Sequence, residues 1–88
     1  MENRIALIGI IVEDKEAVQR LNEVLHEYGE VIVGRMGIPY HKRNISVISV
    51  VVDAPNDVIS ALSGKLGMVP HVNIKTVYSK VTAAVDAP

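Results

Sequence analysis

Apolar residues in the first half of the chain change their spacing along the sequence. Residues 5–12 are an unbroken aliphatic run flanked by charge, which is typical of a strand covered on both faces. Within residues 17–28 the apolar positions recur every three or four residues, which predicts an amphipathic helix capped by Asp14 and ended by Gly29. Residues 31–37 alternate weakly and contain glycine, so we expect a shorter, bent edge strand there.

The sequence of the second half of the chain predicts two further strands and one further helix. Residues 45–52 are strongly β-branched and indicate a strand that forms a hairpin with the previous one. Residues 53–57 supply cap-forming side chains and a proline for a helix over 58–67. Gly64 inside that helix costs about 1 kcal/mol relative to alanine, which suggests a close packing contact. Residues 72–78 alternate, which favours a half-exposed strand.

The order of these elements predicts a single α+β domain. Strand, helix, strand, strand, helix, strand is the ferredoxin-like βαββαβ arrangement, and right-handed crossovers give an antiparallel sheet ordered 4-1-3-2. Two helices then cover one face of the sheet. We assign residues 1–81 to this domain and residues 82–88, which show no periodicity, to a loose C-terminal tail.

The strands expected at the centre of the sheet are apolar on both of their alternating faces. Leu7 and Val47 are apolar like their neighbours Ile8 and Ile48, so the face without helices also needs a cover. A chain of 88 residues has a thin core and gains from an oligomer interface. The simplest cover is a second copy of the chain, packed sheet to sheet or edge to edge, in a homodimer or homotetramer.

Composition narrows the chemistry that this chain can carry. It is 49% apolar and 22% charged with a net charge of −1, which disfavours direct nucleic-acid binding. The absence of cysteine excludes disulfides, thiolate metal sites and a cysteine nucleophile. The aliphatic run is far shorter than the ~20 residues that span a bilayer. We therefore expect a cytoplasmic protein with no membrane association and no cofactor.

Polar residues gather at one end of the predicted sheet. The turn after the first strand, the tip of the central hairpin and the turn into the last strand all lie at that end, which we call the rim. A ligand site within one subunit is expected there, although capping and solvation explain the same residue types. The candidate ligand-binding residues are Glu13, Asp14, His41, Lys42, Arg43 and His71.

Metal binding and catalysis are the alternative interpretations. His41 and His71 lie at opposite edges of the sheet, about 14 Å apart at the usual strand spacing, so they would share a metal only across a subunit interface. An enzyme active at such an interface would draw on Lys65, His41 and Arg43. The sequence contains no nucleophile beside a base and no glycine-rich loop that opens a helix, so we expect no catalytic residues and no enzyme activity.

Several segments resemble a known family of small regulators. The resemblance covers about the first eighty residues, and its most specific part is Leu62-Ser-Gly-Lys-Leu-Gly67. It rests on Arg4 to Asp14, Leu21-Asn-Glu-Val-Leu-His26, Arg35-Met-Gly-Ile-Pro39, Asn56-Asp57, Ala61-Leu-Ser-Gly-Lys-Leu-Gly67 and Val72-Asn-Ile-Lys-Thr-Val77. These segments are similar to those of the regulators of the iron-only hydrogenase system.

The resemblance implies an ACT-like fold, also similar to the C-terminal domain of nickel-responsive repressors, and a regulatory role. Val12-Glu-Asp-Lys15 replaces the glycine-bearing turn of many amino-acid-binding ACT domains, and the cysteine of the repressors' nickel site is missing. The leading hypothesis is therefore an oligomeric regulatory or ligand-sensing domain without chemistry of its own. Its partners would be further copies of itself and either a small-molecule effector or a regulatory protein.

Overall fold

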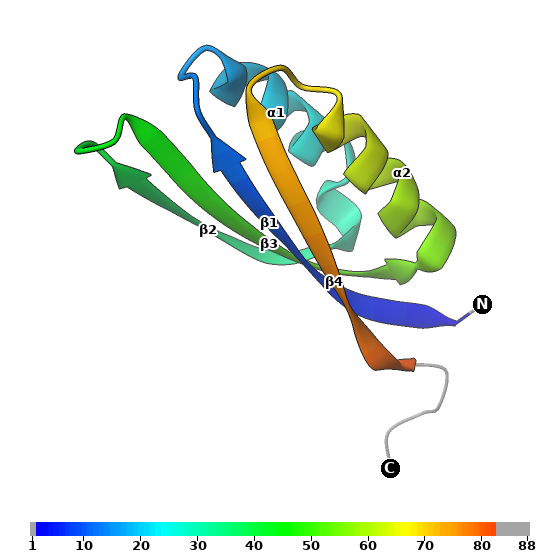
Figure 1. Cartoon of the computed structure of the whole chain (residues 1–88). Helices are drawn as coiled ribbons and strands as arrows, with labels where there is room; N and C mark the ends of the chain where they lie inside the picture. Colours follow the sequence, from blue (N-terminus) through cyan, green and yellow to red (C-terminus); the bar gives the residue numbers. More distant parts are fainter. Residues whose placement is uncertain (1, 83–88) are drawn as a thin grey trace.

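The chain forms one four-stranded sheet with two helices, and the computed structural model describes residues 2–82. The elements are arranged in the order β1, α1, β2, β3, α2 and β4 (Figure 1). Their bounds are Asn3–Val12 for β1, Ala17–Glu27 for α1, Ile32–Tyr40 for β2, Ile45–Pro55 for β3, Asn56–Gly67 for α2 and Val72–Thr82 for β4. A short 3-10 turn, Gly29–Val31, precedes β2. The predicted βαββαβ arrangement is confirmed.

The sheet is antiparallel, with strands ordered β2-β3-β1-β4. This is the predicted order 4-1-3-2, read from the other edge. β1 and β3 occupy the centre because each pairs with a strand on both sides. None of the helices among residues 2–82 is long and apolar enough to cross a bilayer.

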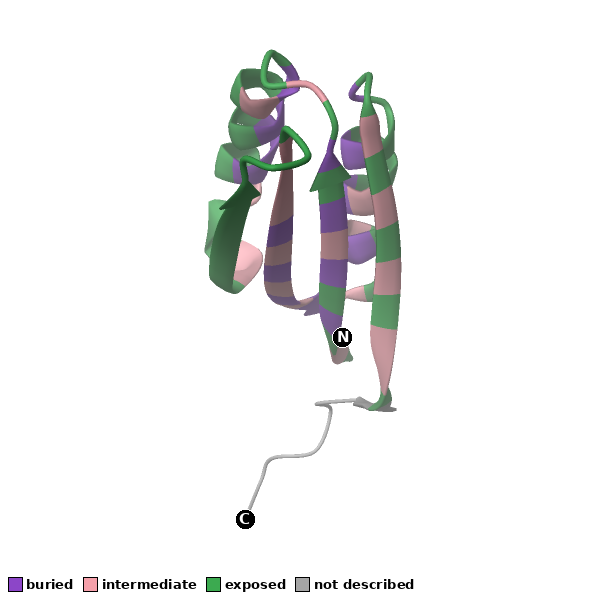
Figure 2. Cartoon of the chain, turned by 60° about the vertical axis from the view of Figure 1, so that its left-hand side comes forward, coloured by how far each residue is buried: buried purple, intermediate pink, exposed green. Residues whose placement is uncertain are grey.

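Alternate residues of the central strands build the core. The buried positions of these strands face the helices, whereas β2 is exposed along most of its length (Figure 2). The helices contribute leucine, valine and isoleucine side chains from one side of each. The buried set includes Ala6, Ile8, Ile10, Val12, Ile48, Val50, Val52 and Ala54 from the strands, and Leu21, Val24, Leu25, Ile59, Leu62 and Leu66 from the helices.

The opposite face of the sheet, which we call the open face, is not covered by any element of residues 2–82. Residues opposite one another in an antiparallel ladder share a face, so the strand register defines its members. Its apolar residues are Ile5, Leu7, Ile11, Met36, Ile38, Tyr40, Val47, Val51 and Val77. The two-sided apolar pattern read from the sequence therefore corresponds to one buried and one uncovered face.

Helix ends differ from the sequence predictions. Asp14 does not cap α1, whose N-cap is Glu16; the Asp14 carboxylate instead accepts the backbone N–H of Glu16 at 3.0 Å and fixes the preceding turn. Gly29 does directly follow the C-cap Tyr28, as predicted, but it has no positive φ and begins the 3-10 turn. Nothing lies within 4 Å of a Cβ placed on Gly64, so the suggested close contact is wrong.

Cross-strand pairing makes the strands longer than their local sequences indicate. β2 continues past Gly37 to Tyr40, because its last residues pair with the start of β3. β4 extends to Thr82, which pairs with Arg4 after an irregularity in the ladder. The predicted tail therefore loses its first residue, and residues 83–88 lie outside the described part of the chain.

Candidate ligand site at the rim of the sheet

The connections expected to form the rim lie at the same end of the sheet, as Figure 1 shows. The backbone N–H of Glu13 donates to the carbonyl oxygen of His71 at 2.9 Å and joins the β1–α1 turn to the α2–β4 turn. Lys15 and His41 line one hollow and join the β1–α1 turn to the hairpin tip. The rim is therefore formed by segments that are far apart in the sequence.

One group of rim residues forms polar contacts within the chain. The side-chain amide of Asn73 donates to Glu13 Oε1 at 3.1 Å, and His71 Nε2 lies 4.0 Å from Asp14 Oδ2. The second distance is too long for a direct hydrogen bond. His71 has a left-handed φ of 64°, which turns the chain into β4. Glu13, Asp14 and His71 thus support the turns on one side of the rim.

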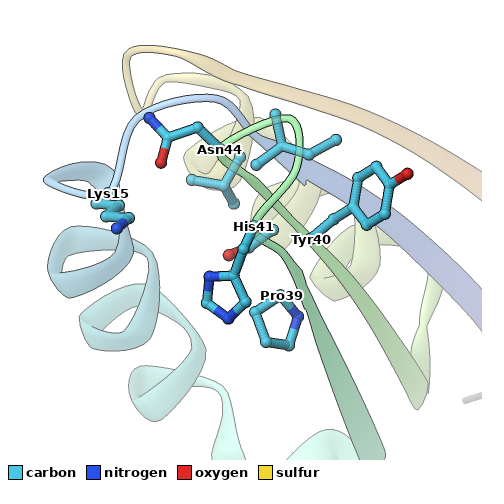
Figure 3. Close-up of a pocket in the computed structure, with 8 residues that line it drawn as sticks. Lys15, Pro39, Tyr40, His41 and Asn44 are labelled. Atoms are coloured by element: carbon cyan, nitrogen blue, oxygen red, sulfur yellow. The ribbon is translucent and has the colours of Figure 1, made fainter.

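A small hollow forms the other side of the rim (Figure 3). It leaves about 40 Å³ for the centres of water-sized molecules. Its apolar lining comes from the end of β1 and the start of β3, and its polar lining from the hairpin tip and the start of the helix. The lining residues are Val12, Lys15, Pro39, Tyr40, His41, Asn44, Ile45 and Ser46.

The hairpin tip has a defined shape that fixes which side chains reach the hollow. Asn44 adopts a left-handed φ of 57°, and its backbone N–H donates to the carbonyl oxygen of His41 at 3.2 Å. Asparagine tolerates this conformation better than most residues. Lys42 and Arg43 are exposed at the tip and do not line the hollow.

The six predicted site residues therefore do not form one cluster. Sequence analysis identified His41 but missed Lys15 and Asn44. The missed signal for Asn44 is an asparagine at the end of a polar turn directly before a β-branched run, where a left-handed residue is often needed. Lys15 carries no comparable signal, because its contribution depends on how the tip folds over the helix start.

The residues named for metal binding and catalysis come from different elements: Lys65 lies on α2, whereas His41 and Arg43 lie at the hairpin tip. No group of three or more metal-ligating side chains occurs within the described residues. Lys65 lies on α2, where its Nζ donates to Glu27 Oε2 at 3.0 Å and stands 5.4 Å from the centre of the Tyr28 ring. The hydrogen bond with Glu27 raises the pKa of Lys65, which keeps the amine protonated. Lys65 therefore links the two helices.

Comparison with known proteins supports the resemblance read from the sequence. The model of the family described as "TM1266-like: Iron-only hydrogenase system regulator, putative" matches residues 4–76. The structure of the uncharacterized protein TM1266 from Thermotoga maritima is 40% identical, with a TM-score of 0.85, and the match covers 90% of this chain and all of that one. The family named by the sequence resemblance is confirmed. A search of curated proteins found no match.

More distant structures share the fold alone. An unknown protein from Galdieria sulphuraria is 15% identical with a TM-score of 0.61, and the match covers 94% of this chain and 49% of that one. The divalent ion tolerance protein CutA1 from Ehrlichia chaffeensis is 17% identical with a TM-score of 0.51, over 90% of this chain and 84% of that one. The likeness to ACT domains and nickel-responsive repressors stays a prediction.

Proposed function

Because this chain belongs to the TM1266-like family of iron-only hydrogenase system regulators, we propose that it is a homo-oligomeric regulatory domain that senses a small ligand and catalyses no reaction. Its copies associate through the open face, and the rim receives the ligand. The observation that carries the self-association is the uncovered apolar surface of the sheet.

The open face exposes a contiguous set of large apolar side chains. Leu7 is 44% exposed, Ile38 56% and Val77 64%, although all three lie within regular strands. Four strands spaced about 4.8 Å apart and about eight residues long cover roughly 500 Å² per copy, hence about 1,000 Å² for a pair. The total of about 1,000 Å² for a pair reaches the lower limit of specific protein interfaces. The value of about 500 Å² per copy lies in the upper part of the range of the largest patches on monomers, and such patches are often functional.

The charge pattern of the open face suits a second copy of the same chain. Its regularly paired positions carry one acidic side chain, Asp53, and one basic side chain, Lys75. Two such faces meet without net charge repulsion.

Gly9 provides a second reason for a facing copy. It lies at the centre of the open face between Leu7 and Ile11, in a trough that also contacts Val47 and Lys75. A Cβ on Gly9 would meet only the Lys75 carbonyl oxygen, at 3.9 Å, so the packing of one chain does not require glycine there. Glycine weakens a strand interior, and a close approach from another molecule explains its presence.

Sedimentation equilibrium of the full chain tests this proposal. The wild type is expected to be a dimer or larger, and Leu7→Glu a folded monomer, because the oligomer would bury an unpaired carboxylate. Met68→Glu is the matched control: Met68 is 83% exposed in the turn after α2, outside the open face, so this variant should associate like the wild type.

Val77→Glu repeats the test on β4, in case Leu7→Glu fails to fold. Circular dichroism of each variant shows whether the fold persists. A monomeric wild type at concentrations of about 100 μM would contradict the proposed self-association, since that corresponds to less than about 6 kcal/mol of binding free energy. Unchanged association in both glutamate variants would place the interface elsewhere.

A further inference from the structure

We infer that the hollow formed by Lys15, His41 and Asn44 is a subsite for the carboxylate group of a small organic acid. This inference names the ligand class for the proposed sensing role and does not depend on self-association. Figure 3 shows the labelled side chains around the hollow, with the lysine on the helix side and the histidine and asparagine on the hairpin tip.

Polar side chains around this hollow lack partners within the chain. Three other basic groups near the helices are engaged: Lys65 of α2 with Glu27, Arg20 of α1 with Glu23, and Arg35 of β2 with Asn22 of α1. By contrast, the side chains of Lys15, His41 and Asn44 make no hydrogen bond or ion pair within the described residues. They present donors to the same small space.

The acidic residues of the rim are directed to other contacts. Glu13 accepts a hydrogen bond from Asn73, and Asp14 accepts one from the backbone N–H of Glu16. Neither lines the hollow, nor does Glu16. Lys15 is therefore the charged residue of the lining, which gives the hollow a positive character that favours an anion.

The size and the floor of the hollow favour a carboxylate over a larger anion. Its 40 Å³ corresponds to roughly three water molecules, which matches a carboxylate and an adjoining carbon. Val12, Pro39 and Ile45 supply an apolar floor for that carbon. A tetrahedral phosphate has no apolar atom to place there, so the lining offers it fewer matched contacts.

An NMR titration of the full chain with sodium acetate, with chloride lowered to hold ionic strength constant, tests the inference. We expect saturable amide shifts confined to residues 12–17 and 39–46, with a dissociation constant on the order of millimolar for so small a ligand. Lys15→Gln should weaken acetate binding at least about fivefold, because it removes a charge-assisted contact. Lys80→Gln, at the far end of β4, makes the same charge change and should leave the affinity within about twofold.

Several results would overturn the inference. Shifts that do not saturate would show that acetate does not bind, and equal weakening by Lys42→Gln would show an effect of overall tip charge. Tighter binding of inorganic phosphate at the same amides would overturn the carboxylate assignment. Repeating the titration on Leu7→Glu separates the two proposals, because acetate binding should persist there even where the oligomer is lost.

Discussion

The contact between Lys65 and Glu27 shows how single residues connect the two helices. It joins α2 to the end of α1 and lies beside the Tyr28 ring. The hydrogen bond and charge of Lys65 lower the pKa of Glu27 below its ordinary value of 4.5. Because both side chains are largely exposed, this ion pair contributes little to the stability of the fold.

The contact has a predictable pH dependence. Glu27 has a lower pKa in the folded than in the unfolded chain, so its stabilising contribution is full above pH 4.5 and is lost as the pH falls through the folded pKa. In Lys65→Met, the titration midpoint of the Glu27 side-chain carboxyl carbon, followed by NMR, should rise toward its ordinary value. Lys80→Met is the control and should leave that midpoint in place. An unchanged midpoint in Lys65→Met would show that the ion pair does not form in solution.

At the scale of elements, Gly64 weakens α2 without a packing reason. It is exposed inside the helix, and nothing lies within 4 Å of an added Cβ. Gly64→Ala should raise the free energy of unfolding by about 0.5 to 1 kcal/mol through helix propensity and reduced freedom of the unfolded chain. Urea denaturation measures this change. A loss of stability would mean that a neighbouring molecule approaches the helix at this position.

Hydrophobic spacing predicted both α-helices and all four strands found within residues 2–82, because period and burial are linked directly in both kinds of element. It did not predict their ends. Asp14 bonds the N–H of Glu16 and stabilises a turn, and β2 gains its last residues by pairing with β3. Such ends depend on competition between local hydrogen bonds and contacts with distant segments.

The general position of the candidate site was predictable from the sequence, but its detailed geometry was not. Topology placed the rim residues at one end of the sheet, but the division into a Glu13–Asp14–His71 side and a Lys15–His41–Asn44 side depends on turn geometry. The left-handed conformations of Asn44 and His71 set the directions of these turns. Sequence alone does not specify which neighbouring side chain then points into the hollow.

At the scale of the whole molecule, a substitution at Gly9 should affect the stability of one chain and the association of two chains differently. An added methyl meets the Lys75 carbonyl oxygen at an ordinary distance of 3.9 Å, so Gly9→Ala should leave the folded monomer as stable or raise its stability by up to about 1 kcal/mol. The same methyl enters the space assigned to the facing copy, and overpacking should weaken self-association by about fivefold or more.

Urea denaturation under dissociating conditions and sedimentation equilibrium measure these two effects of Gly9→Ala separately. Gly64→Ala makes the same chemical change away from the open face and should leave the association constant unaltered. Equal association of Gly9→Ala and the wild type would show that the trough is not part of the interface.

An isotope-filtered NOE experiment tests the central claim, that a second copy covers the open face, most directly. A mixture of labelled and unlabelled chains reports only contacts between copies. Cross-peaks between subunits from the methyl groups of Leu7, Ile11 and Val77 are the predicted result. Cross-peaks restricted to the outer edges of β2 or β4 in an oligomeric sample, or none at all from a monomer, would contradict the account.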